Sequence, residues 1–237
     1  VAIQLFSLGI PCIYYGTEQA LAGPEPEQRR WLPDWGGSDR YLREAMFGPS
    51  HPRKSGRAGL RDAGDGEETQ LPGFGPFGTA GSHVFDSDHA AYVRIAALAA
   101  LRAAFPALRH GRQYLRPLRL PGRGFAVHGP GELAAWSRIL DDEEVLCIVN
   151  ANGAARRGGD VVVDADLNRL DGKLTVILNT AESADPGTYS GTHPVGSQLP
   201  THRVEDGTLY VEIRGVGPSE VLVLTNHPVA DEGAVTP

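Results

Sequence analysis

The spacing of apolar residues changes at Pro106, and this change constrains the fold more than any other feature of the chain. In residues 88–104 the apolar side chains recur at helical spacing, and Asp86, Ser87 and Asp88 stand where they can cap the first turn. The pattern predicts an amphipathic helix over 88–104 that ends before the proline.

Beyond Pro106 the chain consists of short strand-like runs separated by turn residues. The eight predicted strands cover 113–118, 124–127, 133–140, 144–150, 160–163, 173–178, 208–213 and 220–224. Asp141 and Asp142 join two of these runs as a tight hairpin. Eight short strands in this arrangement predict an antiparallel β-sandwich.

The N-terminal residues carry a different signal. Residues 9–18 read Gly-Ile-Pro-Cys-Ile-Tyr-Tyr-Gly-Thr-Glu. An apolar run that ends in paired aromatics, a glycine and a carboxylate is typical of a buried parallel strand at the functional rim of an α/β barrel. We expect helical turns in residues 1–8 and a strand at 10–15, with Cys12 buried in it as a small hydrophobe. Cys147 is expected to be buried in the same way, within the run 144–150.

A long connection links this strand to the helix. From residue 19 to about residue 85 the chain has little periodicity and much glycine and proline, apart from one amphipathic stretch at 40–47. A connection of this length usually serves function as a lid or binding loop. Strand, loop and helix together predict one β/α unit.

The motif at residues 9–18 resembles the eighth-strand motif of the α-amylase family of glycoside hydrolases. The following order is similar as well: a variable loop, a helix ending Leu-Arg-Ala-Ala-Phe-Pro-Ala-Leu-Arg, and an all-β C-terminal domain. The resemblance implies the last β/α unit of a TIM-type (β/α)8 barrel followed by an antiparallel β-sandwich. The implied domains are 1–105, a C-terminal remnant of the catalytic barrel; 106–227, the sandwich; and 228–237, a tail.

The same resemblance implies retaining hydrolysis or transfer of α-glucosidic linkages. This chemistry needs one carboxylate to attack the anomeric carbon and another to protonate the leaving oxygen. The family carries these groups on earlier strands, the last of them in an Asn-His-Asp motif, and no Asn-His-Asp occurs here. We therefore assign no catalytic residue, expect the chain alone to be inactive, and interpret Glu18 as a rim anchor.

The resemblance also points to sugar contacts in the loop. Asp39 and Arg43 are similar to the Asp and Arg with which several family members hold the donor-side sugar, and an ordinary helical ion pair is an equal alternative. Trp31 and Trp35 are the candidates for stacking on glucose rings. The expected partners are an α-glucan or oligosaccharide, and either the missing N-terminal barrel segment or another copy of the chain, because a lone barrel strand has unpaired edges.

Two other functions remain open. A non-catalytic carbohydrate-binding module predicts exposed aromatics on the sandwich, where the chain offers Trp136, Tyr114, Tyr189 and Tyr210. A purely structural sandwich that caps the barrel needs none.

Other classes of partner are excluded by charge and spacing. The net charge of −7 argues against nucleic acid, and no apolar run reaches membrane-spanning length. Asp164, Asp166 and Asn168 resemble the opening of a calcium loop, but Arg169 occupies the position that requires glycine, so no metal site is expected. The glycines of 73–78 follow no strand, so no dinucleotide or other cofactor is expected.

Overall fold

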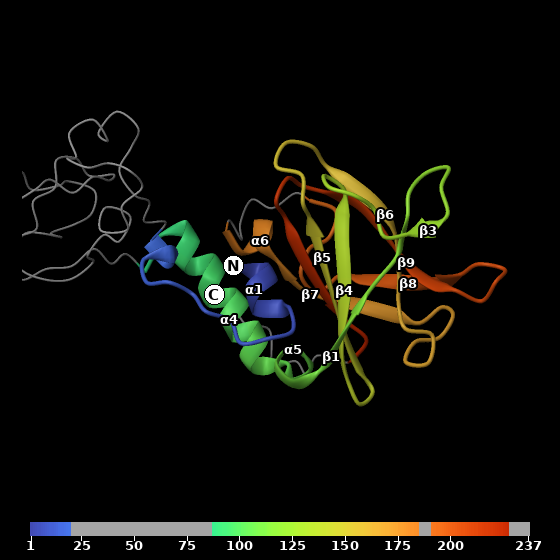
Figure 1. The fold of residues 1–237 in the computed structure, drawn as a ribbon, viewed down its shortest axis with the longest axis horizontal. Helices are drawn as coiled ribbons and strands as arrows, with labels where there is room; N and C mark the ends of the chain where they lie inside the picture. Colours follow the sequence, from blue (N-terminus) through green and yellow to red (C-terminus); the bar gives the residue numbers. More distant parts are fainter. Residues whose placement is uncertain (20–86, 185–190, 228–237) are drawn as a thin grey trace, which may run out of the picture. The chain divides into compact units, whose positions relative to one another are not determined.

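The computed structural model of the chain describes residues 1–19, 87–184 and 191–227. The chain divides into two compact units, Val1–Cys12 with Val93–Pro237, and Ile13–Tyr92. All described strands lie in the first unit (Figure 1). Its architecture is mostly β.

The described helices are short except for one. They are α1 (Ala2–Phe6), the 3-10 helix η1 (Thr17–Gln19), α4 (Ala90–Ala104), α5 (Pro106–His110) and α6 (Thr180–Ala184). The strands are β1 (Arg112–Leu115), β2 (Leu118–Arg119), β3 (Phe125–Ala126), β4 (Leu133–Leu140), β5 (Glu143–Asn150), β6 (Arg157–Val162), β7 (Lys173–Asn179), β8 (Gln198–Arg203), β9 (Leu209–Val216) and β10 (Val221–Thr225).

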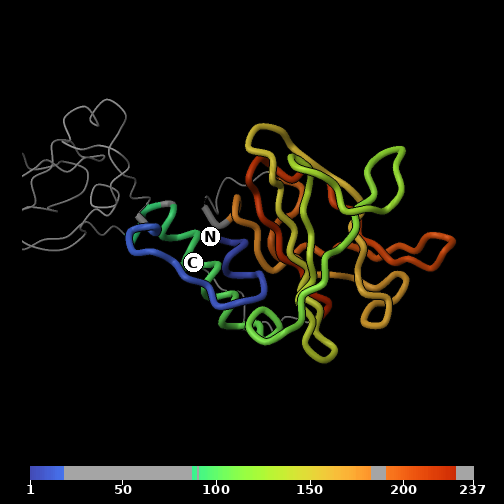
Figure 2. The backbone as a smooth tube through the Cα atoms, in the orientation of Figure 1, coloured from blue at the N-terminus to red at the C-terminus, as the bar shows by residue number. Residues whose placement is uncertain are grey.

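The strands form one antiparallel sheet in the order β1-β4-β5-β10-β7-β8-β9-β6-β2-β3. β8 joins its two halves, because residues 198–200 pair with β7 whereas residues 201–203 pair with β9. The tube in Figure 2 can be followed from the long strands of the first half into the projecting β8–β9 hairpin of the second. The halves curl over one another, and side chains from both enter one apolar core.

This first core follows from period-two alternation. In β9, Leu209, Val211 and Ile213 are fully buried, while the intervening Tyr210 and Glu212 lie on the solvent face. The inner residues meet others from β2, β4, β5, β6, β7, β8 and β10. Burial of each such side chain contributes about 1.5–3 kcal/mol before the entropy cost of ordering it.

A second core lies on the opposite face of the first half of the sheet. There the helices α1, α4 and α5 contribute Leu5, Phe6, Leu98, Leu101 and Leu108. They pack on Trp136, Val145, Cys147, Val149, Leu178, Val221 and Val223. β5 and β10 are therefore covered on both faces, which explains why their sequences are continuously apolar instead of alternating.

Most elements expected from the sequence are present. The helix expected at 88–104 is α4, each of the eight strand-like runs contains a strand, and the hairpin at Asp141 is formed with Asp141 in the left-handed region at a φ of 52°. Pro106 ends α4 and also begins α5, because its fixed φ suits the first position of a new helix. The mostly β antiparallel architecture is confirmed, and the helix expected in residues 1–8 is α1.

Two expectations at the N-terminus are wrong. Residues 10–14 form no strand, since no described strand lies beside them to complete a parallel ladder, and Ile10 is 98% exposed. Cys12 is consequently exposed, although Cys147 is buried as expected. The described residues thus include no barrel strand, and the proposed boundary between barrel remnant and sandwich stays a prediction.

Candidate functional site

The residues predicted to contact sugar, Asp39, Arg43, Trp31 and Trp35, lie outside the described residues. Glu18 lies in the 3-10 helix, whose Thr17 hydroxyl donates to the carbonyl of Tyr14 at 2.7 Å. Within the described residues Glu18 itself has no hydrogen bond, so its expected anchoring is not observed there.

The first buried polar site among the described residues is the junction between α1 and the sheet. Arg138 of β4 is fully buried, and its Nη1 donates to the carbonyl oxygen of Phe6 at 3.0 Å. Its Nε and Nη2 donate to the carbonyl of Gly111 at 3.3 and 2.8 Å. Trp136, also on β4, donates its indole N–H to the same Phe6 oxygen at 3.1 Å.

A second arginine, which lies on α4, also donates hydrogen bonds to carbonyls at this junction. Arg102 donates through Nη1 to the carbonyls of Leu5 and Leu108, the latter at 2.7 Å, and through Nη2 to that of Gly9 at 3.5 Å. The last carbonyls of a helix have no partner within it, so the two arginines supply the donors that α1 and α5 lack. Burial lowers the pKa of Arg138, which nevertheless keeps its charge because an unperturbed guanidinium titrates far above neutral pH.

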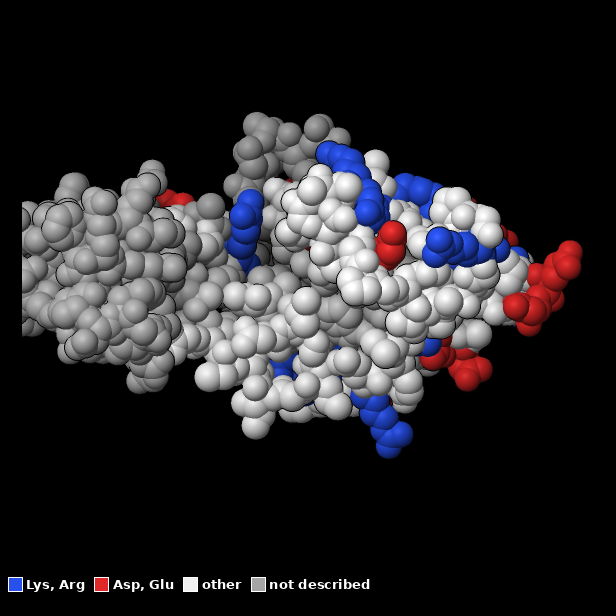
Figure 3. Space-filling model, turned by 45° about the horizontal axis from the view of Figure 1, so that its top comes forward, with Lys and Arg blue, Asp and Glu red and all other residues white. Residues whose placement is uncertain are grey.

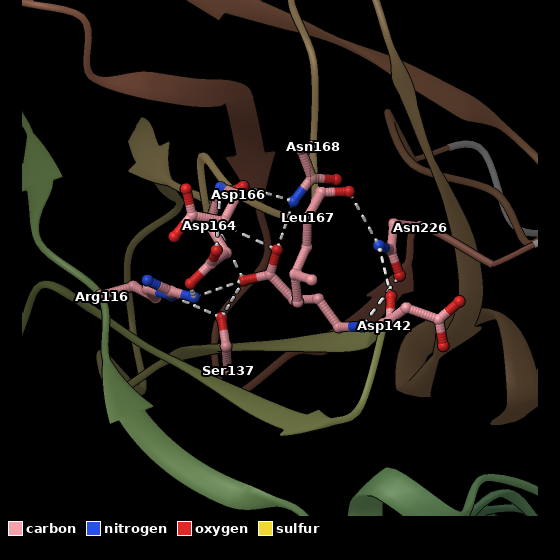
Figure 4. Close-up of polar contacts among 9 residues, drawn as sticks. Arg116, Ser137, Asp142, Asp164, Asp166, Leu167, Asn168 and Asn226 are labelled. Atoms are coloured by element: carbon pink, nitrogen blue, oxygen red, sulfur yellow. Dashed lines mark hydrogen bonds and ion pairs between the residues drawn. The ribbon is translucent and has the colours of Figure 1, made fainter.

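Glu144 of β5 is the centre of the second buried polar cluster. Figure 4 labels the residues around it, among them Arg116, Ser137, Asp164 and Asn168. Its carboxylate, fully buried, accepts from Ser137 Oγ at 2.5 Å and Arg116 Nη2 at 2.8 Å on one oxygen. The other oxygen accepts from Asn168 Nδ2 at 2.6 Å and the backbone N–H of Asp164 at 3.1 Å. The carboxylate is thus fully satisfied by protein donors.

This cluster explains the calcium-like spacing in the sequence. Asp164 pairs with Arg116 at 3.1 Å, and its other oxygen accepts from the N–H of Asp166 at 3.1 Å in a local turn. Asn168 is committed to Glu144. Among the described residues, no group of three or more His, Cys, Asp or Glu side chains is placed to hold a metal ion.

A histidine supplies an acceptor at the start of α4. The backbone N–H of Ala91, which has no acceptor within the helix, donates to Nδ1 of His89 at 3.2 Å. Capping by the aspartates stays a prediction. No described helix is long and apolar enough to cross a membrane.

A third polar cluster closes the opposite end of the first half of the sheet. His193 is 6% exposed, and its Nε2 lies 2.8 Å from the carbonyl oxygen and 3.1 Å from the amide nitrogen of Arg214. Asn179 donates to the carbonyl of His193 at 3.0 Å and to the carboxylate of Glu220 at 2.8 Å. Burial lowers the pKa of His193, opposed by its hydrogen bond to the Arg214 backbone and by the charge of Glu220.

The lowered pKa predicts that acid destabilises the fold through His193. The folded state takes up the proton less readily than the unfolded state, whose imidazole titrates near 6.5. This contribution to stability is complete above that pH and declines as the pH falls below it. Urea unfolding from about pH 8 to about pH 5 will show a steeper loss in the wild type than in His193→Gln. Equal pH slopes in the two proteins would contradict the assignment.

The aromatics expected for a carbohydrate-binding module are not arranged as a row. Trp136 is 5% exposed and belongs to the core beneath the helices, whereas Tyr114 on β1 is 43% exposed. Tyr210 lies on the solvent face of β9, and Tyr189 lies outside the described residues.

The buried polar residues Arg138, Glu144 and Asn179 were not singled out from the sequence. Each of them is a polar residue within or at the end of an apolar strand. This pattern indicates that the side chain has a hydrogen-bond partner but does not identify that partner.

Comparison with known proteins finds a similar fold among solved structures. No family model matches the sequence, and no curated protein matches it. Among solved structures, the chain is similar to CldA, a cyclomaltodextrin glucanotransferase with a three-domain ABC distribution, at 20% identity and a TM-score of 0.50, over 96% of this chain and 31% of that one.

Two further solved structures are more distant. The Nostoc punctiforme debranching enzyme matches at 16% identity and a TM-score of 0.43, over 94% of this chain and 29% of that one. AmyP in complex with maltose matches at 16% identity and 0.36, over 75% and 33%. The chain spans about a third of their length, and the likeness to CldA shows a shared fold.

Proposed function

We propose that this chain is the C-terminal part of an enzyme that hydrolyses or transfers α-glucosidic linkages by a retaining, two-carboxylate mechanism. Residues 1–105 are the end of its catalytic barrel, and residues 106–227 are a structural β-domain. The chain contributes a sugar-binding loop and the domain that supports it, and the catalytic carboxylates belong to the rest of the enzyme.

The observation that carries this proposal is the joining of the N-terminal helices to the sheet. Phe6 is fully buried and its carbonyl accepts from both Arg138 and Trp136, so the segment that would lead to the barrel rim is fastened to the β-domain by donors and by apolar packing. A β-domain that caps a barrel needs this kind of attachment. The shared fold with CldA, itself a glucanotransferase, supports the same conclusion.

The exposed apolar residues of the same unit support a missing partner. Ile3, Leu8 and Ile10 are 55%, 67% and 98% exposed, and they lie within eight positions of each other in sequence. Burial of such side chains is favourable by roughly 25 cal/mol per Å² of apolar surface. We assign their cover to the remaining barrel segment, with a second copy of the chain as the alternative.

Within the loop we propose that Asp39 and Arg43 hold hydroxyl groups of the donor-side sugar, and that Trp31 and Trp35 stack on its rings. A carboxylate and a guanidinium supply acceptors and donors that suit a polyhydroxylated ring. The proposal rests on the family resemblance of the loop sequence.

The proposal is tested by the reading frame upstream of Val1 and by the activity of its product. We expect that frame to encode an Asn-His-Asp motif, and the complete product to hydrolyse or transfer maltoheptaose. The 237-residue chain alone should release nothing from the same substrate, as measured by reducing-end assay and chromatography. Turnover by the chain alone would overturn the assignment of the carboxylates to another segment.

A further inference from the structure

The second half of the sheet carries a polar and aromatic surface that neither apolar core explains. Phe125 of β3 and Tyr210 of β9 are both partly exposed, and neither belongs to the residues that form the two cores. An antiparallel sheet with one solvated face normally presents polar side chains there. The two aromatic rings on this face therefore lie outside both apolar cores.

Strand register places these residues side by side. Arg119 of β2 lies opposite Phe125 on one side and opposite Asp160 of β6 on the other. On the next strand pairing, Tyr210 lies opposite His202 of β8. The surface thus extends continuously over β3, β2, β6, β9 and β8, and we call Phe125, Arg119, Tyr210 and His202 the arginine–aromatic surface.

Its side chains contact one another. The guanidinium carbon of Arg119 lies 4.9 Å from the ring centroid of Phe125 and 4.7 Å from that of Tyr210. The Phe125 and Tyr210 rings are 5.8 Å apart, and the His202 ring is 5.4 Å from Tyr210. Asp160 fixes the guanidinium from the other side, accepting from Arg119 Nε at 2.8 Å. Each of these contacts limits the conformations of the free side chains, which reduces the entropy cost of ordering them when a ligand binds.

Charge decides what kind of ligand fits. Asp160 also accepts from Arg214 at 2.6 Å, and Arg214 lies 3.5 Å from Glu212. Arg119 and Arg214 are therefore balanced by Asp160 and Glu212, so these four groups together carry no net charge. Figure 3 shows Lys and Arg side chains and Asp and Glu side chains on the described face in view, with broad areas that carry neither.

We propose that the arginine–aromatic surface is a secondary binding site for a neutral oligosaccharide. Ring faces and edges contact the C–H faces of the sugar, while the guanidinium and phenol groups exchange hydrogen bonds with its hydroxyls. The choice of an α-glucan as ligand rests on the proposed function. The binding surface itself rests only on the geometry given above, and it lies on elements other than the loop of residues 20–86.

The test is an NMR titration of the full 237-residue chain with maltoheptaose, with cellohexaose in parallel. We expect maltoheptaose to shift the signals of Tyr210 and His202. Tyr210→Ala and Phe125→Ala should each weaken binding at this surface by about fivefold to tenfold. Circular dichroism will establish that each variant is folded, and Phe125 lies on a two-residue strand at the edge of the sheet.

Tyr114→Ala is the matched control, because Tyr114 is also an exposed tyrosine beside an arginine, with the Arg116 guanidinium 5.8 Å from its ring, but on β1. It should leave binding at the arginine–aromatic surface unchanged. Binding that is insensitive to both Tyr210→Ala and Phe125→Ala, or no shift with either sugar, overturns the proposal. Shifts that follow protein concentration alone would assign the surface to self-contact and also overturn it.

The two sugars separate this proposal from the proposed function. Binding of cellohexaose but not maltoheptaose at Tyr210 supports the surface as an oligosaccharide site and counts against an α-glucan enzyme. An upstream reading frame without an Asn-His-Asp motif would overturn the enzyme assignment. A maltoheptaose-dependent shift at Tyr210 would still support the surface as a binding site.

Discussion

Replacing Arg138 with methionine should lower the free energy of unfolding by about 3 kcal/mol. The methionine fills a similar volume but donates no hydrogen bond, so the carbonyl of Gly111 loses both of its guanidinium donors and that of Phe6 keeps only the Trp136 indole. A buried carbonyl left without a donor costs about 1–3 kcal/mol. Urea denaturation followed by circular dichroism measures the loss.

Arg94→Met on the exposed face of α4 is the control, and it should change stability by no more than about 0.5 kcal/mol. Amide exchange gives a local readout: the N–H of Ser7, bonded to Ile3 O in α1, should exchange faster in Arg138→Met and not in Arg94→Met. An Arg138→Met variant as stable as the wild type would show that the arginine is not what holds α1 to β4.

The second large effect is expected at Glu144. Replacing it with alanine should cost about 3–5 kcal/mol, because Ser137 Oγ and the backbone N–H of Asp164 lose their acceptor in a buried space. Arg116 and Asn168 lose one acceptor each and keep their bonds to Asp164. Repeating the substitution in an Arg116→Met background completes a double-mutant cycle, for which we expect a coupling of about 1–3 kcal/mol.

The control for Glu144 is another arginine-paired glutamate. Glu132 lies 3.2 Å from Arg157, but the two side chains are 34% and 30% exposed. Solvent weakens such a pair, so Glu132→Ala should cost less than about 1 kcal/mol. Similar losses for the two alanine variants would contradict a special role for the buried cluster.

The sequence predicts the strands and the long helix well, because local periodicity determines them. It fails at β8, where Pro200 and the polar Gln198, Thr201 and His202 conceal a strand that joins the two halves of the sheet. It also fails at residues 10–14, where an apolar run becomes a strand only if neighbouring strands are present to pair with it.

The polar clusters could not be predicted because their partners are distant in sequence. Arg138 donates to a carbonyl 132 positions away in the sequence. Asp160 pairs with Arg119, which is 41 positions away, and with Arg214, which is 54 positions away. Alternation indicates which face of a strand a residue occupies but not which strand lies beside it. The loop residues Asp39 and Arg43 remain predictions from the resemblance.

The two cysteines give the chain an internal reporter of how its helix layer opens. Cys147 is fully buried in the core between the helices and β5, and burial raises the pKa of its thiol, which suppresses the reactive thiolate. Cys12 is exposed on the segment that follows α1. A thiol-labelling reagent reacts only with the thiolate, and the Cys147 thiolate forms only after the residue is exposed. The slow labelling rate of Cys147 therefore measures the separation of α1, α4 and α5 from the sheet. The fast labelling rate of Cys12 is the reference in the same molecule.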